Sequence, residues 1–129
     1  SDREVLTIFA QCCCGLRHTH ARHILHRDIK GQNIFLTAAG VVKIGDYGIA
    51  KMLDSTAAQV RTKVGTPFYT APEVCDSLEY GLKADVWSLG VVLYEMSALH
   101  LPFQAPNLMS LLVKIVQHDP PPLPDFRGE

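Results

Sequence analysis

The chain has 129 residues, of which 47% are hydrophobic and 19% charged, and its formal net charge is −1. This length and apolar content predict one globular domain with a buried core. The near-zero net charge and scattered basic residues argue against nucleic acid or an anionic membrane surface as a partner, and no apolar run approaches the roughly 18 residues that cross a bilayer.

Hydrophobic periodicity predicts the first half of the chain in order. Residues 2–20 have the apolar spacing of a helix. Two β-rich segments, 33–36 and 41–44, flank the turn 37–40 and predict a small hairpin. Residues 47–69 show no sustained period and are expected to form a long loop, and long loops in compact domains tend to be functional.

The second half is predicted to be helical until a proline-rich tail. Residues 83–98 include Trp87 and leave hardly any polar face, which predicts a helix buried in the middle of the domain. A loop over 99–106 leads to a third helix at 107–117. The tail from Asp119 holds several prolines and is expected to be non-helical.

Three of the four cysteines stand in a row at positions 12–14. Neighbouring residues on a helix point in different directions, so this run cannot form a disulfide with itself, and a reduced, intracellular chain is favoured. A metal site formed with the nearby histidines is the alternative. A structural zinc site needs four converging side chains, so we prefer packing for Cys12 and Cys13, with solvent around some of the histidines.

Four side chains in and beside the predicted hairpin suit phosphoryl transfer, which asks a protein mainly to place the nucleophile, neutralise phosphate charge and hold metal ions. Asp28 is the candidate catalytic base, and Lys30 is placed to offset charge on the transferred group. Asn33 and Asp46 offer oxygen ligands to magnesium. A hairpin between them returns the chain to its starting point, and Gly48 allows the bend that aims the aspartate.

These residues stand in four motifs that resemble eukaryotic Ser/Thr protein kinases. The motifs are HRDIKGQNIFL at 26–36, IGDYGIAK at 44–51, GTPFYTAPE at 65–73 and DVWSLG at 85–90. Their order resembles the catalytic loop, the two ends of the activation segment and the central helix of that family. The first and third are most similar to the NIMA-related kinases, a cell-cycle and cilium-associated group.

The resemblance implies an α+β, mainly α fold: the C-terminal lobe of a kinase, with a small hairpin that carries the catalytic and metal-binding loops. Residues 1–129 would be a partial kinase domain. Its expected parts are the catalytic loop 26–33, the activation segment 46–73, the central buried helix at about 83–98 and the next helix at about 107–117. The sequence contains no glycine-rich phosphate loop or nucleotide-clamping lysine strand. We therefore expect the small lobe and the last helices to be absent.

The resemblance also implies roles in substrate handling and regulation. Thr66 is expected to hydrogen-bond near the catalytic base and its lysine. Arg27 is expected to grip a phosphate on the activation loop, with Lys51 in the same basic pocket. Thr62, four residues before Thr66, is the best candidate for the phosphorylated residue.

Four further residues have implied structural roles. His26 is expected to pack in the core behind the catalytic loop, and Tyr47 replaces the family's usual Phe as an aromatic plug. Glu73 pairs in the family with an arginine of a later helix. Asp85 caps a helix and holds the backbone of the catalytic loop.

By this resemblance the parent protein phosphorylates Ser or Thr residues of protein substrates, with ATP and Mg2+ (or Mn2+) as cofactors, and nucleic acid and membrane are not partners. An intracellular, cytoplasmic location is implied, with the cytoskeleton, cilium or centrosome as possible sites. Two alternatives stay open: a catalytically silent pseudokinase, and a truncated interaction module. The intact catalytic and metal residues favour the kinase, while the isolated 129 residues are expected to be inactive.

Overall fold

The computed structural model describes residues 1–46, 67–76 and 78–123. In chain order its elements are α1 (Asp2–His20), the 3-10 helix η1 (Gly31–Asn33), β1 (Ile34–Leu36), β2 (Val42–Ile44), α2 (Pro72–Cys75), α3 (Leu82–Ala98) and α4 (Leu108–Gln117). The described part of the chain is therefore rich in helix, with one small antiparallel sheet. This agrees with the expected α+β, mainly α class.

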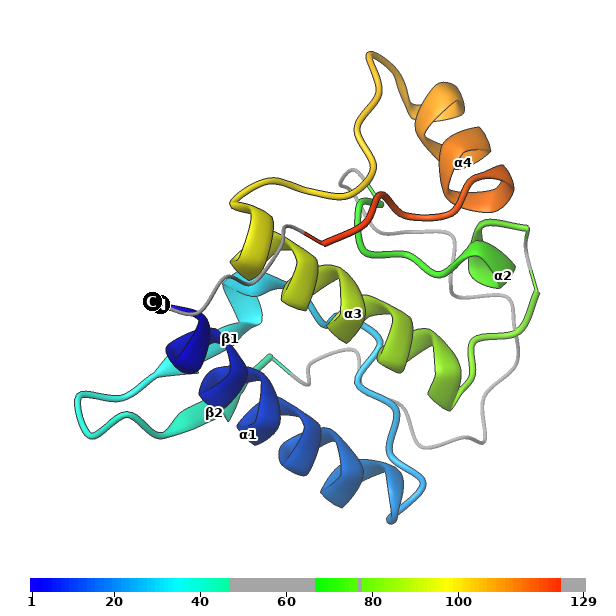
Figure 1. The fold of residues 1–129 in the computed structure, drawn as a ribbon. Helices are drawn as coiled ribbons and strands as arrows, with labels where there is room; N and C mark the ends of the chain where they lie inside the picture. Colours follow the sequence, from blue (N-terminus) through cyan, green and yellow to red (C-terminus); the bar gives the residue numbers. More distant parts are fainter. Residues whose placement is uncertain (47–66, 77, 124–129) are drawn as a thin grey trace.

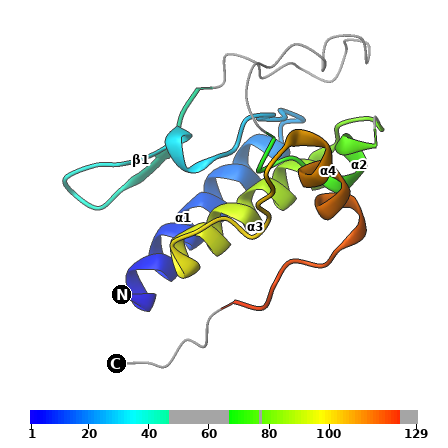
Figure 2. The same ribbon diagram turned by 90° about the horizontal axis from the view of Figure 1, so that it is seen from above.

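The longest helices, α1 and α3, lie side by side and run in opposite directions (Figures 1 and 2). The core between them is formed by Cys12, Leu16, Ile29, Leu89 and Val92, all buried. Burying an aliphatic side chain of this size stabilises the fold by about 1.5–3 kcal/mol. The α1–α3 pair is thus the platform on which the remaining elements are placed.

A second, smaller core lies on the other side of α3, where α2 and α4 pack together (Figure 1). Phe103, Leu111 and Ile115 are its buried members. The ring of Trp87 stacks on Phe103 with centroids 6.3 Å apart and an interplanar angle of 9°. Trp87 therefore packs in a core, as expected, although its side chain is only partly buried.

The hairpin is short, and its register pairs Ile34 with Ile44, Phe35 with Lys43 and Leu36 with Val42. The turn needs Gly40, whose φ of 78° lies in the left-handed region that favours glycine. The first strand begins one residue later than predicted, because the Asn33 amide donates to the Lys30 carbonyl (3.0 Å) and closes a 3-10 turn.

One prediction about the helices is corrected, and one short helix was missed. The helix predicted at 83–98 is present as α3, but it is not buried all round: the side of α3 that carries Leu82 and Val86 leaves them 40% and 50% exposed. An apolar sequence favours a helix here without fixing what covers each of its sides. The one-turn helix α2 was not predicted, although Pro72 at its first position and Glu73 after it are helix-start residues.

The third helix is present as α4, one residue shorter at its start than predicted, because Asn107 is the N-cap and its side chain accepts from the Ser110 amide (2.9 Å). Residues 118–123 contain no helix. No helix in the described part of the chain is long and apolar enough to span a bilayer.

The three consecutive cysteines differ in burial, and the predicted packing of Cys13 is wrong. Cys12 is fully buried, whereas Cys13 and Cys14 are exposed. The reason is helical geometry, because each step along α1 turns the side chain by more than a quarter of a turn. Only one residue of the three can face α3 and the hairpin.

We predict that a thiol reagent at pH 8 modifies Cys14 in the folded chain and reaches Cys12 only after unfolding. Burial raises the pKa of Cys12 from 9.0 to about 11, and the thiolate is the reactive form. Mass spectrometry of the labelled chain checks this difference in reactivity, and equal labelling rates for Cys12 and Cys14 would contradict it.

The same shift makes the stability of the fold depend on pH. Because the folded pKa is raised, Cys12 contributes stability that is complete below about pH 9 and is lost as the pH rises towards 11.

Candidate active site

The loop between α1 and the hairpin, residues 26–33, is held from the protein interior by His26. This side chain is fully buried. Its Nδ1 accepts from the Asp28 amide (3.1 Å), and its Nε2 lies 2.9 Å from the Gly45 carbonyl oxygen. Since Nδ1 accepts, the ring proton resides on Nε2 and is donated to Gly45. His26 thus joins the backbone of Asp28 to the residue that precedes Asp46.

Asp85 lies inside the first turn of α3, whose N-cap is Gly81, so the expected capping role is wrong. Its side chain instead holds the same loop from the α3 side. Its carboxylate accepts from the backbone amides of His26 (2.9 Å) and Arg27 (3.0 Å). It also contacts His20 Nε2 at 2.8 Å and accepts from the Tyr80 hydroxyl at 2.5 Å. A buried carboxylate is stable only when its oxygens are hydrogen-bonded, and these four partners tie α1, the loop and α3 to one side chain.

Tyr80 and Arg27 form a layer next to Asp85. Burial, followed by the charge of Asp85, raises the pKa of the Tyr80 hydroxyl far above its ordinary value. The hydroxyl therefore stays protonated and donates a hydrogen bond to the carboxylate. The Arg27 guanidinium lies 5.7 Å from the centroid of the Tyr80 ring, which is the geometry of a cation–π contact. Among the described residues, the buried Nε of Arg27 has no hydrogen-bond partner.

Arg27 also has a strained backbone, with φ at 68°. A non-glycine residue in this region is uncommon, and here the Arg27 amide is fixed by Asp85. The bend it makes separates the buried His26 from Asp28, whose side chain is partly exposed. The Asp28 side chain keeps 15% of its surface exposed, while its backbone is anchored by His26 and Asn33.

Lys30 and Asn33 surround Asp28. Lys30 Nζ lies 3.6 Å from Asp28 Oδ2, so the two side chains are on the same side of the loop. Asn33 is buried, and its Nδ2 donates to the Asp28 carbonyl oxygen at 2.7 Å. Because the amide nitrogen makes this bond, the amide oxygen of Asn33 points away from the Asp28 carbonyl.

Asp46 follows the hairpin at its open end. The Gly45 amide donates to the Asn33 carbonyl oxygen (2.8 Å), which extends the strand pairing by one step and brings residues 33 and 46 to the same end of the hairpin. Asp46 is exposed and has φ at 59°. A Cβ atom on Gly45 would lie 2.6 Å from the Phe35 ring, so only glycine fits beneath that ring.

Asn33 and Asp46 together fit a magnesium ion, because carboxylate and amide oxygens are its preferred protein ligands and Mg2+ usually takes only one or two of them. Among the described residues, no three His, Cys, Asp or Glu side chains stand close enough to share a metal ion.

The rim of the site contains a pair that the sequence analysis missed. The Tyr69 hydroxyl donates to Glu95 Oε2 at 2.6 Å, and burial, followed by Glu95, raises the pKa of Tyr69 well above its ordinary range. A Cβ on Gly31 would lie 3.3 Å from the same Glu95 oxygen. The signal for Glu95 was its position as the one charged residue in the second half of α3.

Five predicted residues lie outside the described part of the chain: Tyr47, Gly48, Lys51, Thr62 and Thr66. Glu73, in α2, is described and is only half-buried. A one-turn helix at the edge of the second core leaves this carboxylate partly open to solvent.

Residues 1–120 match a protein family described as "Protein kinase domain". This chain belongs to the protein kinase family. The serine/threonine-protein kinase Nek1 of Mus musculus is 49% identical over 122 residues, which are 95% of this chain and 10% of that relative.

Two other Nek kinases are similarly related. Nek5 of Homo sapiens is 49% identical over 131 residues, covering 100% of this chain and 18% of the relative, and Nek3 of Mus musculus is 50% identical over 123 residues, covering 95% and 24%. The resemblance to NIMA-related Ser/Thr kinases is thereby confirmed. The chain spans less than a third of the length of these relatives.

Proposed function

We propose that this chain supplies the catalytic loop and the metal-binding residues of a kinase that transfers the γ-phosphate of ATP to Ser or Thr residues of intracellular protein substrates. On this proposal it forms most of the C-terminal lobe of the kinase domain. The observation that carries the proposal is the joining of the Asp28 backbone to both strands at the open end of the hairpin, through Asn33 Nδ2 at 2.7 Å and through His26 to Gly45.

The roles follow from chemistry and exposure. Asp28 orients the substrate hydroxyl and accepts its proton, and Lys30 at 3.6 Å limits the negative charge at that point. Asn33 and Asp46 would hold Mg2+, which when bound neutralises phosphate charge. Arg27 and Lys51 would bind a phosphate on Thr62, and Thr66 would position the substrate near Asp28.

The experiment is a chimera in which these 129 residues replace the matching segment of the mouse Nek1 kinase domain. We expect the chimera to phosphorylate a serine peptide with ATP and Mg2+, and to stop when EDTA removes the metal. The 129-residue chain alone is expected to show negligible transfer, because its sequence has no glycine-rich loop or clamping lysine.

Two results would contradict the proposal, and a third would contradict the expected inactivity of the isolated chain. A folded chimera without activity, beside an active Nek1 domain, would support the pseudokinase alternative. Undiminished transfer after metal removal would exclude the proposed role of Asn33 and Asp46. Robust Mg2+-dependent transfer by the 129 residues alone would show that the expected inactivity is wrong.

A further inference from the structure

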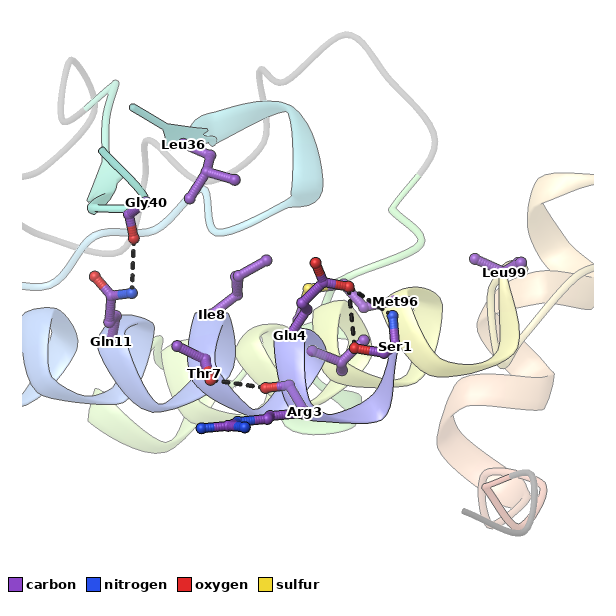
Figure 3. A pocket seen from close by; sticks show the side chains of 11 residues that line it. Ser1, Arg3, Glu4, Thr7, Ile8, Gln11, Leu36, Gly40, Met96 and Leu99 are labelled. Carbon is purple, nitrogen blue, oxygen red and sulfur yellow. Dashed lines mark hydrogen bonds and ion pairs between the residues drawn. The ribbon is translucent and has the colours of Figure 1, made fainter. Parts of the chain in front are cut away.

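Gln11 on α1 uses both ends of its side-chain amide on the hairpin. Its Nε2 donates to the Gly40 carbonyl oxygen at 3.1 Å, and its Oε1 accepts from the Val42 amide at 3.0 Å. Figure 3 shows the side chain reaching from the helix to Gly40. One residue therefore binds the turn and the first residue of β2 together, in the way that a neighbouring strand would.

Packing alone does not hold this end of the hairpin. A hollow of about 620 Å³ lies between α1, the hairpin and the end of α3. Gln11 and Gly40 are at its edge, and Leu36, Ile8 and Met96 line it (Figure 3). Leu36 is 59% exposed. The tip of the hairpin thus stands across a gap from the helix, and the Gln11 amide spans the edge of that gap.

The other end of β2 is held by close contact. Gly15 lies four residues after Gln11, on the same face of α1, and a Cβ there would be 3.3 Å from Ile44 Cδ1. Ile44 and Val42 also pack on the buried cluster that contains Cys12. The hairpin therefore has two kinds of attachment: apolar contact of Val42 and Ile44 along β2, and the Gln11 hydrogen bonds to Gly40 in the turn and to the Val42 amide.

The Gln11 hydrogen bonds matter because the hairpin is too small to maintain its own strand pairing. It has three residue pairs, and an isolated two-stranded hairpin is marginally stable at best. By binding the turn and the first residue of β2, Gln11 supports that pairing. Asn33 precedes β1 and Asp46 follows β2, so a change in the pairing or twist of the two strands changes the distance and angle between the two oxygens that would bind metal.

We propose that Gln11 is a positioning residue for these metal ligands, an inference that rests on the proposed function of Asn33 and Asp46. A metal site loses affinity when its ligands move by about half an ångström. Removing the outer groups that orient ligands typically weakens metal binding by about 10- to 100-fold. Because Gln11 acts at a distance, through the hairpin, we expect the lower value.

The test uses the 129-residue chain labelled with 15N and Mn2+ as the probe. In the wild-type chain, the amide signals of Asn33 and Asp46 are expected to broaden at the lowest Mn2+ concentrations, and Mg2+ should reverse this. Gln11→Met keeps the length of the side chain and removes both hydrogen bonds. It is expected to need about tenfold more Mn2+, with faster hydrogen exchange at the Val42 amide.

Matched variants separate positioning from folding. Gln117→Met, on the exposed end of α4, should bind Mn2+ as the wild type does. Gln11→Glu keeps the acceptor for Val42 and loses the donor to Gly40, so an intermediate affinity is expected, and it serves if Gln11→Met does not fold. Wild-type Mn2+ affinity in either folded Gln11 variant would overturn the inference. No broadening at Asn33 and Asp46 in the wild type would instead reject the metal site itself, and the inference with it.

Discussion

Replacing Asp85 by alanine is expected to lower the free energy of unfolding by about 3–5 kcal/mol. The carboxylate is fully buried and accepts from two backbone amides, His26 N and Arg27 N. Without it, both amides lose their partner away from water, and each unsatisfied buried group costs about 1–3 kcal/mol. Urea unfolding of the 129-residue chain, followed by circular dichroism, measures the change.

Two matched variants show whether the loss comes from this network. Asp119→Ala removes an exposed carboxylate from the tail after α4 and should change the stability by less than about 0.5 kcal/mol. His20→Ala removes one of the four partners of Asp85 and should have an effect between the two. If Asp85→Ala were as mild as Asp119→Ala, the hydrogen bonds from His26 and Arg27 would not be what holds the loop.

The positions of the longer helices could be predicted from the sequence, whereas the burial of individual side chains on them could not. Periodicity placed α1, α3 and α4 within a residue of their observed ends, because a helix repeats its apolar positions regardless of what packs on them. The exposure of Val86 and of Cys13 could not be predicted in the same way, since burial depends on which neighbour reaches each side of the helix. The missed helix α2 has a single turn, too short for any period.

For the candidate site, the functional residues could be predicted from the sequence, but the contacts that hold them in place could not. Motif order and spacing were enough to nominate Asp28, Asn33 and Asp46, since a hairpin must return the chain to its start. The links that hold these residues come from side chains far away in sequence. His20 lies 65 residues from Asp85, and Gln11 lies 31 residues from Val42. No local pattern marks such pairs, so only the three-dimensional structure connects them.

Asp28→Asn in the Nek1 chimera is expected to lower kcat by about 10²- to 10⁴-fold and to leave the KM for ATP nearly unchanged. A positioned general base contributes a factor of this size. An asparagine keeps the shape of the side chain and loses the ability to accept a proton. The backbone of residue 28 should stay in place, because it is held by His26 Nδ1 and by the Asn33 side chain. Initial rates over a range of ATP and peptide concentrations give both constants.

A comparison with Asp46→Asn separates the base from the metal ligand. Asp46 lies at the open end of the hairpin, so its replacement should raise the Mg2+ concentration needed for half-maximal rate, whereas Asp28→Asn should leave that concentration unchanged. Asp119→Ala is again the matched control. If Asp28→Asn instead retained wild-type kcat and shifted only the Mg2+ requirement, the Asp28 carboxylate beside Lys30 would be a metal-site group, and the assignment of Asp28 as the base would be wrong.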